Sequence, residues 1–302
     1  RGETCCDDVF KVKLVKENFG FDPNKYFDVS DEVLNFYREA GQKGIEKENT
    51  WNDLFKEYKN KYKELAEEYE LFASGKLPKD WKKDLPVFKG GDKIGSRKAS
   101  GKMLNAIADY LPNLIGGSAD LAPSTDTNLN QYKSFSSENF GGRNFHFGIR
   151  EHAMGAILNG LALSKFIIPY GATFLIFSDY MRPPIRLAAI MKLRPIYVFT
   201  HDSIALGEDG TTHQPVEQLI GLRSVPNLTV IRPADANETV QAWRVAIEHS
   251  GGPVAIILTR QKVPVIDQEK YTNASELEKG AYILSDSKSK PDIILIATGS
   301  EV

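Results

Sequence analysis

The segment "ATFLIFSDYMRPPIRLAAIMKLRPIYVFT" (Ala172–Thr200) decides the fold class. Residues 172–177 and 195–200 are short, continuous apolar runs of strand length, and residues 185–192 between them have the composition of a helix. Strands that are buried on both faces have such runs, and parallel neighbours need a crossover between them. The segment therefore predicts a strand–helix–strand unit of a parallel sheet.

The same alternation continues in both directions along the chain. We expect further helices over residues 97–111, 151–165, 215–224 and 236–250, and further strands over residues 113–117, 144–149, 228–233 and 253–259. This pattern is typical of an α/β fold in which helices flank a parallel sheet. Ligands of such sheets bind beyond the carboxyl ends of the strands. Functional side chains should therefore directly follow the strands.

Composition places the chain among ordinary globular proteins. It has 302 residues, enough for about two domains, with 41% hydrophobic and 26% charged residues. The net charge of -2 argues against nucleic-acid binding, and apolar runs such as 253–258 are too short to span a membrane. No signal peptide is visible, and the only cysteines are the neighbours Cys5 and Cys6. We expect a cytoplasmic protein, with a plastid as the open alternative.

Both ends of the chain look cut. The first residue is Arg1 rather than Met, and residues 291–302 are an apolar strand and turn with nothing after them. Because a strand needs neighbours in a sheet, we expect the chain to be part of a longer protein.

Residues 31–85 have a different texture. Apolar residues recur at helical spacing between Trp51 and Phe72, and Thr50 with Asp53 could form a capping box. This pattern predicts an amphipathic helix over residues 50–72 that packs against a neighbour. Residues 74–93, rich in Lys, Pro and Gly, read as an exposed connector.

Reactive side chains follow five of the predicted strands. They are Ser118, Asp120 and Ser124; Arg150, Glu151 and His152; Asp179 and Tyr180; His201, Asp202, Glu208, Asp209 and His213; Arg260 and Gln261. Each alone could be a helix cap, but together they indicate a site. Glu151 begins a helix that is apolar nearly all round, so we expect this helix to be buried. The carboxylate is then either a cap favoured by the helix dipole or a functional group.

Several longer motifs resemble a known family. The stretches "IGGSADLAPS", "FGIREHAMGAILNG", "THDSIALGEDGTTHQPVEQ", "RPADANE" and "TGSEV" resemble transketolase in the same order. The resemblance covers residues 12–302, whereas residues 1–11 do not resemble the family. It implies the end of a diphosphate-binding domain with a helical linker (1–92), a pyrimidine-binding domain (93–268) and the start of a C-terminal domain (269–302).

The resemblance also implies the reaction. Transketolases are homodimers that use thiamine diphosphate and Mg²⁺ to move a two-carbon ketol unit from a ketose phosphate, such as xylulose 5-phosphate, to an aldose phosphate, such as ribose 5-phosphate. The reaction belongs to the pentose phosphate pathway or the Calvin cycle. Because the cofactor lies between two domains of different subunits in this family, we expect the 302-residue chain by itself to be inactive.

Cofactor contacts carry over to particular residues. Glu151 matches the glutamate that hydrogen-bonds the aminopyrimidine nitrogen, a catalytic role that would need a raised pKa. Phe174, Phe177 and Tyr180 match the aromatic residues around that ring, and Asp120 matches a residue close to the cofactor. Phe174 and Phe177 are three apart, so both can reach one ring only if the strand bends or ends between them.

Substrate contacts carry over in the same way. Arg97, Ser124, His201 and Arg260 match the cluster that binds the sugar phosphate. Two guanidinium groups suit a phosphate because they offer paired donors. Asp209 matches the residue that binds a substrate hydroxyl, and His213 matches a second catalytic residue, a histidine near the reacting carbonyl.

No metal ligand is assigned to this chain. Glu208-Asp209-Gly210 followed by Asn237 imitates the Gly-Asp-Gly and Asn pattern of thiamine enzymes, but position 208 is Glu. We expect the Mg²⁺ ligands in the N-terminal domain of the longer protein. Ala205 and Thr211 depart from the Gly and Pro of many transketolases.

Other functions stay open at this point. Dihydroxyacetone synthase and deoxyxylulose-phosphate synthase share the cofactor chemistry, and a non-catalytic dimerisation or binding module is the alternative from another class. Intact Glu151, His201, Asp209 and His213 favour an enzyme over such a module.

Overall fold

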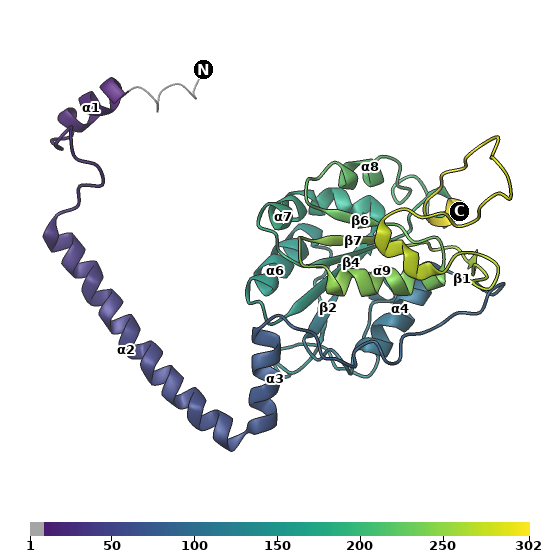
Figure 1. Cartoon of the computed structure of the whole chain (residues 1–302), viewed down its shortest axis with the longest axis horizontal. Helices are drawn as coiled ribbons and strands as arrows, with labels where there is room; N and C mark the ends of the chain where they lie inside the picture. The colour runs from purple at the N-terminus through teal and green to yellow at the C-terminus, as the bar shows by residue number, and fades with distance from the viewer. Residues whose placement is uncertain (1–8) are drawn as a thin grey trace. The chain divides into compact units, whose positions relative to one another are not determined.

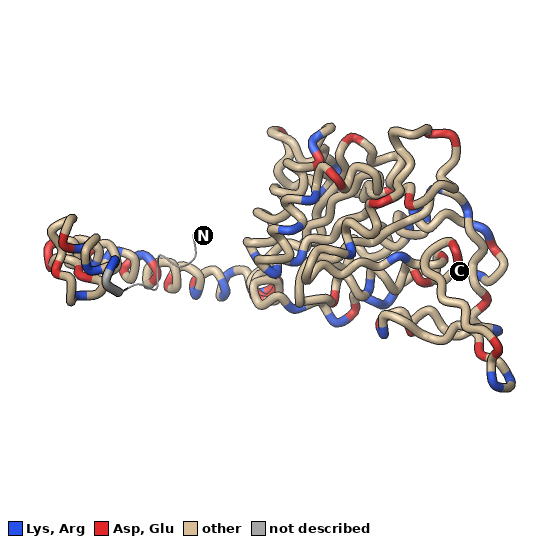
Figure 2. Tube along the Cα trace, turned by 90° about the horizontal axis from the view of Figure 1, so that it is seen from above, with Lys and Arg blue, Asp and Glu red and all other residues tan. Residues whose placement is uncertain are grey.

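The structure, a computed structural model, describes residues 9–302. Cys5 and Cys6 lie outside the described residues. The described chain divides into two units, residues 9–68 and residues 69–302. Figure 2 shows Lys and Arg intermingled with Asp and Glu along the described trace, in keeping with the near-neutral net charge. Within residues 9–302, no helix combines the length and the hydropathy that crossing a bilayer requires.

The first unit is helical. It contains α1 (Val9–Asn18), α2 (Asp31–Lys61) and the beginning of α3 (Lys63–Ala73), which runs into the second unit. Ser30 is the N-cap of helix α2, and its side chain accepts a hydrogen bond from the Val33 N–H. Two acidic residues in the first turn also stabilise this end of the helix through the helix dipole.

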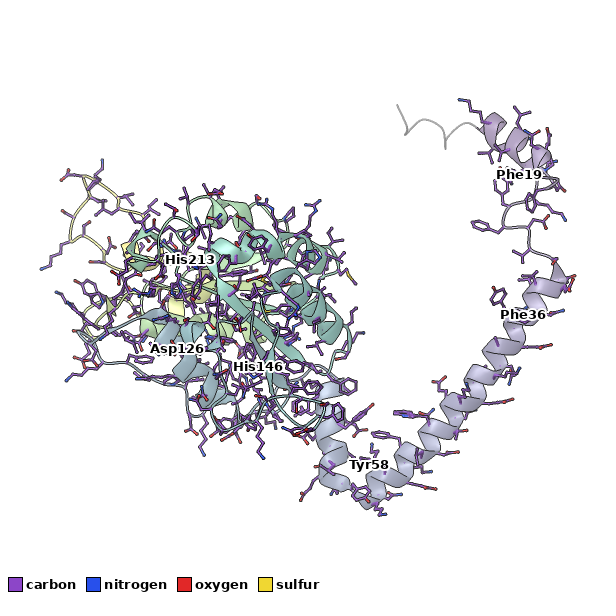
Figure 3. The ribbon with its side chains drawn as sticks, turned by 180° about the vertical axis from the view of Figure 1, so that it is seen from behind. Phe19, Phe36, Tyr58, Asp126, His146 and His213 are labelled. Carbon is purple, nitrogen blue, oxygen red and sulfur yellow. The ribbon has the colours of Figure 1, made fainter. Side chains whose placement is uncertain are left out.

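The predicted helix over residues 50–72 is therefore two helices, and its predicted start is wrong. Thr50 lies inside α2, where its hydroxyl donates to the Glu46 carbonyl at 2.9 Å, so it cannot form a capping box with Asp53. The predicted packing is found in only part of this segment: Ala66 and Phe72 of α3 are buried and the Tyr69 ring contacts the Phe166 ring at 5.0 Å, whereas no residue of α2 is buried. The Trp51 ring instead stacks on Phe55 at 5.1 Å, and Figure 3 shows Phe36 and Tyr58 projecting from the helix.

The second unit is built on a six-stranded sheet in which every adjacent pair is parallel. Its order is β3 (Asn144–His146), β2 (Leu114–Ser118), β4 (Ile168–Phe174), β5 (Ile196–Thr200), β7 (Val254–Ile257) and β6 (Thr229–Ile231). The predicted parallel sheet is thus confirmed. The predicted strand 172–177 ends early, because residues Leu175–Phe177 form the 3₁₀ helix η1.

Helices cover both faces of this sheet (Figure 1). The helices are α4 (Ser96–Ile107), α5 (Ala122–Thr125), α6 (Glu151–Leu163), α7 (Ser178–Ile190), α8 (Gln218–Arg223) and α9 (Ala236–Glu248). On β5, Ile196 and Val198 pack with α4 and α9, whereas Tyr197 and Phe199 pack with α6 and α7. This alternation follows from the period of two along a strand, and it explains why the central strands are apolar throughout.

Helix α6 corrects another expectation. The sequence predicts a buried helix, but only one face is covered: Glu151, Met154 and Leu158 are buried, whereas Ile157 is 47% and Leu163 54% exposed. The sheet covers the residues that face it, and the apolar residues on the other side remain at the surface of the described chain.

The remaining segments lie around the sheet. Strands β1 (Lys93–Ile94) and β8 (Val263–Pro264) form a short antiparallel pair, and the other elements are the 3₁₀ helices η2 (Ile204–Leu206), η3 (Ala274–Lys279) and η4 (Gly299–Glu301). The predicted connector over 74–93 is not wholly exposed, because Trp81 is 2% exposed and packs into the core. The strand expected within residues 291–302 is absent from the described structure, and Ile296 there is 93% exposed.

Candidate functional site

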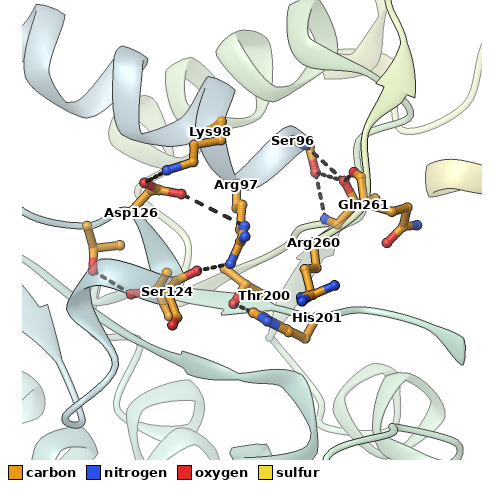
Figure 4. Close-up of polar contacts among 12 residues, drawn as sticks. Ser96, Arg97, Lys98, Ser124, Asp126, Thr200, His201, Arg260 and Gln261 are labelled. Carbon is orange, nitrogen blue, oxygen red and sulfur yellow. Dashed lines mark hydrogen bonds and ion pairs between the residues drawn. The ribbon is translucent and has the colours of Figure 1, made fainter. Parts of the chain in front are cut away.

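The site is positioned by the carboxyl ends of neighbouring parallel strands. Phe174 at the end of β4 pairs with Thr200 at the end of β5, and Phe199 pairs with Ile257 at the end of β7. The residues that follow these strands therefore emerge at one edge of the sheet, as the sequence predicts. Figure 4 shows Arg97, Ser124, His201 and Arg260 gathered there.

An aromatic cluster lies at the end of β4. The strand stops at Phe174, and the tight turn of η1 brings the Phe177 ring parallel to the Phe174 ring, with centroids 6.0 Å apart and an interplanar angle of 12°. The strand end that the sequence requires is therefore present. The Tyr180 ring continues the cluster at 6.1 Å from Phe177, although Tyr180 is 63% exposed.

Two imidazoles contact this cluster. The His201 ring lies 3.7 Å from the Phe174 ring, and the His213 ring meets Phe177 edge-on at 5.4 Å. His201 Nδ1 and the Thr200 hydroxyl share a hydrogen bond of 2.8 Å, and His201 has a left-handed backbone with φ of 61°. His213 Nδ1 is bonded in the same way to the Thr212 hydroxyl. Both rings thus stand against the aromatic faces with one nitrogen already engaged.

His201 is neutral at physiological pH. Burial, together with the positive charges of Arg97 and Arg260, lowers its pKa to about 4 against the opposing effect of Asp209. A neutral imidazole with one nitrogen held by Thr200 can still donate or accept one hydrogen bond at the other nitrogen. Its chemistry here is therefore hydrogen bonding and not charge.

Each arginine is held by a backbone carbonyl. Arg97, at the start of α4, donates from Nη1 to the Ser124 carbonyl at 2.5 Å. Arg260 donates from Nη1 to the Leu206 carbonyl at 2.6 Å. Gly207 allows this approach, since its φ is 112° and a Cβ there would lie 2.7 Å from Arg260 Nη1. Both guanidinium groups are thus fixed in orientation by the chain itself.

The two arginines are only loosely matched by carboxylates. Asp209 Oδ2 lies 3.8 Å from His201 Nε2 and 3.8 Å from Arg260 Nε, and Asp126 Oδ2 lies 3.9 Å from Arg97 Nε. Arg97 Nε and Asp126 Oδ2 are buried and have no hydrogen-bond partner among residues 9–302. Burial lowers the pKa of Arg97 against the opposing charge of Asp126, and the nearby Arg260 charge acts in the same direction as burial. The edge therefore has capacity for an added anion.

Glu151 begins α6 and is 8% exposed. It accepts a hydrogen bond of 3.4 Å from the hydroxyl of Thr173, a buried residue directly before Phe174. The carboxylate therefore lies beside the strand that carries the aromatic cluster, at the positive end of a helix.

Not every predicted residue joins these contacts. Asp120 follows β2 with φ of 63° and is exposed, and we find no hydrogen bond or ion pair from it to the other predicted residues among those described. Ser124 contributes its carbonyl to Arg97. No group of three or more His, Cys, Asp or Glu residues suited to a metal ion occurs within residues 9–302. The Asn237 amide is engaged with both backbone groups of Phe88, at 2.9 and 3.0 Å.

Sequence reasoning missed three groups at this site: Thr173 beside Glu151, Asp126 beside Arg97, and the Leu206 carbonyl that holds Arg260. Thr173 could have been found as a polar residue inside an apolar strand. Asp126 lies 29 residues from Arg97 in an irregular turn, so no spacing rule connects them.

Comparisons with known proteins agree with this architecture. The family model for the transketolase pyrimidine binding domain matches residues 92–265, and that for the transketolase thiamine diphosphate binding domain matches residues 6–78. The transketolase of Aquifex aeolicus is 52% identical over 291 residues, which are 96% of this chain and 42% of that protein. The transketolase of Bacillus subtilis is 50% identical over 292 residues, 96% of this chain and 44% of that protein.

A solved structure of the Pichia stipitis transketolase in complex with sedoheptulose-7-phosphate is similar with a TM-score of 0.89 and 42% identity, over 97% of this chain and 44% of that one. The transketolase of Campylobacter jejuni has a TM-score of 0.78 at 40% identity, over 93% of this chain and 42% of that one. The chain thus spans less than half the length of these relatives. The family models cover most of its residues, and the chain belongs to the transketolase family.

Proposed function

We propose that this chain forms part of an enzyme that transfers a two-carbon ketol unit between sugar phosphates with thiamine diphosphate. The observation that carries the proposal is the convergence of Arg97, Arg260 and a buried neutral His201 beside the parallel rings of Phe174 and Phe177. The first group suits a phosphate and the second suits a flat heterocycle. Membership of the transketolase family supports both assignments.

Arg97, Arg260, His201 and Ser124 bind the substrate phosphate in this proposal. The two guanidinium groups repel each other, and their neighbouring carboxylate oxygens lie 3.9 Å from Arg97 Nε and 3.8 Å from Arg260 Nε, so a phosphate can add closer charge-assisted contacts. His201 adds a neutral hydrogen-bond donor at the same place. Asp209 binds a substrate hydroxyl, and His213 donates to the carbonyl oxygen on which charge develops.

Phe174, Phe177 and Tyr180 hold the pyrimidine ring of the cofactor, with Asp120 nearby. The parallel faces at 6.0 Å and the buried carboxylate beside β4 fit a flat ring with a basic nitrogen. When bound, thiamine diphosphate supplies the carbon nucleophile for the ketol unit. Glu151 holds a proton at the ring nitrogen, in surroundings from which water is largely excluded. The Mg²⁺ and diphosphate ligands are proposed to lie outside this chain.

The organisation follows from the same assignment. We propose that residues 1–92 are the end of the diphosphate-binding domain and its linker, 93–268 the pyrimidine-binding domain and 269–302 the start of a third domain. The family-model matches to 6–78 and 92–265 support this division. We further propose a homodimer acting in the cytoplasm, in the pentose phosphate pathway or the Calvin cycle.

The test uses a complete enzyme. A chimaera in which this chain replaces the matching 291 residues of the Aquifex aeolicus transketolase provides it. We expect transfer from xylulose 5-phosphate to ribose 5-phosphate, and no turnover from the 302-residue chain by itself. Faster reaction with formaldehyde as acceptor would favour dihydroxyacetone synthase, and reaction with pyruvate as donor would favour deoxyxylulose-phosphate synthase.

Substitution of the arginines then tests the phosphate site. Arg97→Met or Arg260→Met should raise KM for phosphorylated substrates about tenfold to a hundredfold, because one charge-assisted contact contributes about 1.5–3 kcal/mol. Unphosphorylated ketoses should be affected far less. Arg244→Met, which changes a partly buried arginine of α9 outside the site, is the matched control. An equal loss with both substrate types would assign the arginines a structural role.

A further inference from the structure

Two motifs that the proposed site does not use meet at Arg232. This residue belongs to the stretch "RPADANE" and follows β6, the edge strand of the sheet. Its Nη1 donates to the Thr298 carbonyl at 2.9 Å, and its Nη2 donates to Glu301 Oε1 at 2.9 Å, with a second contact to Glu301 Oε2. Residues of the motif "TGSEV" thus bind the guanidinium group of Arg232, which lies 66 residues before Thr298 in the chain.

A glycine at position 299 is required for this contact. Gly299 has a φ of 66°, and a Cβ at this position would lie 2.6 Å from Arg232 Nε. Only a residue without a side chain lets the backbone of η4 pass so close to the guanidinium. The contact is therefore built into the local backbone and does not depend on surface side chains alone.

The other side of Arg232 binds Asp202. Nε and Nη2 both donate to Asp202 Oδ2, at 2.9 and 2.7 Å. The side chains are 6% and 1% exposed, so this ion pair is buried. Burial raises the pKa of Asp202, and the Arg232 charge opposes that rise. Strand β7 lies between β5 and β6, so Arg232 reaches from the end of one strand to the end of its second neighbour.

Asp202 directly follows His201, whose left-handed backbone with φ of 61° is unfavourable for a residue with a side chain. Such a conformation persists only where surrounding contacts fix it. The Thr200 hydroxyl fixes one ring nitrogen, and Asp202 fixes the next backbone unit through Arg232. The direction of the His201 ring thus depends on a residue that does not touch it.

We propose that Arg232 is a positioning residue for the phosphate site. It holds Asp202 and, through Asp202, the left-handed backbone at His201, which we call the His201 turn. Arg232 is itself held in place by Thr298, Gly299 and Glu301. The proposal rests on the proposed function, because His201 is taken there as a phosphate ligand. It makes the segment 298–301 part of the support of the site. A displacement of that segment loosens the His201 turn.

The experiment uses the chimaera and inorganic phosphate as the probe. Its two readouts are the Kd for phosphate from calorimetry and hydrogen exchange of the amides over residues 200–206. Arg232→Met should raise Kd about 3- to 30-fold, the usual range for coupling through an intermediate residue, and speed exchange in that segment. Arg232→Lys keeps the charge and should restore part of both. Arg244→Met, on the same unit, should change neither.

Loss of Arg232 leaves the Asp202 charge buried and could prevent folding. Glu301→Gln removes only the outer contact, and Glu278→Gln is its matched control because Glu278 also accepts from an arginine of another segment, at 2.6 Å. Glu301→Gln should speed exchange over residues 200–206 and weaken phosphate binding slightly, and Glu278→Gln should do neither. Equal exchange in the two glutamine variants, or a lower melting temperature with unchanged Kd and exchange, overturns the proposal.

The two proposals fail separately. A parent chimaera that does not bind phosphate contradicts the proposed function. The exchange measurement then still decides whether Arg232 holds the His201 turn.

Discussion

Helices α9 and α2 have the same kind of amphipathic pattern in opposite surroundings. Helix α9 has 13 residues and buries nine of them, including Trp243 at 0% exposure. Helix α2 has 31 residues and buries none. An apolar stripe at helical spacing therefore specifies which side of a helix can be buried, while burial itself requires a surface to meet it.

The unit that contains the sheet and the unit that contains α2 also differ in whether they contain predicted site residues. Every predicted site residue lies between Arg97 and Arg260, in the unit that contains the sheet. Strand ends fix the direction of the residues that follow them, as the approach of Phe177 to Phe174 illustrates. An exposed helix offers no such fixed edge, so we expect substitutions in the two regions to differ in the size and the kind of their effects.

The largest expected effect is at Glu151. In the chimaera, Glu151→Gln should lower kcat about a hundred- to ten-thousandfold, because the amide cannot hold the proton at the cofactor nitrogen. Glu57→Gln on the exposed face of α2 is the control and should leave kcat unchanged. The measurement is turnover at saturating substrate, together with the free energy of unfolding of each variant. Normal turnover of a folded Glu151→Gln enzyme would reduce Glu151 to a helix cap.

The next effect concerns the covered helix. Trp243→Ala should lower the free energy of unfolding of the 302-residue chain by about 3–5 kcal/mol, because it leaves a large cavity in the core. It also removes the hydrogen bond of 2.7 Å from the indole to the Ser100 hydroxyl. Urea denaturation followed by circular dichroism measures the change. Trp243→Phe fills more of the space and should cost less, and equal costs would mean that the hydrogen bond dominates.

A smaller effect should appear in the pH dependence of the free energy of unfolding. Since the pKa of His201 is lowered to about 4 from 6.5, the unfolded chain binds a proton below about pH 6.5 that the folded chain does not. The contribution of neutral His201 to the free energy of unfolding is therefore fully present above about pH 6.5, and it is lost as the pH falls toward 4. His201→Gln should lose less stability than the parent between about pH 7 and pH 5. Burial also lowers the pKa of His249, so His249→Gln shows how much of the slope arises elsewhere.

The sheet was predictable because its strands are buried on both faces. Runs such as 195–200 carry that information locally, and the alternate packing of Tyr197 and Val198 follows from it. The gathering of the predicted residues at one edge follows from parallel topology, whereas their individual roles were carried over from the family resemblance and stay predictions.

Contacts between distant segments were not predictable. Arg232 binds Thr298, 66 residues later in the chain, and no pattern within either motif predicts this contact. The sequence predicts an exposed connector around Trp81 because its neighbours are Lys, Asp and Pro, although the indole itself enters the core. Local composition describes average exposure, and a single large side chain can depart from it.

The smallest expected effect is at Trp51, the counterpart of Trp243 on α2. Trp51 is 49% exposed and, among residues 9–302, stacks on its helical neighbour Phe55, so Trp51→Ala in the 302-residue chain should change the free energy of unfolding by about 0.5 kcal/mol or less. The same variant in the chimaera sharpens the comparison, because there the apolar stripe can meet other parts of the enzyme. A loss there comparable to that of Trp243→Ala would show that the two helices differ only in whether a partner surface is present. A loss of that size in the 302-residue chain would instead mean that α2 is covered in solution, and the contrast between the two helices would not hold.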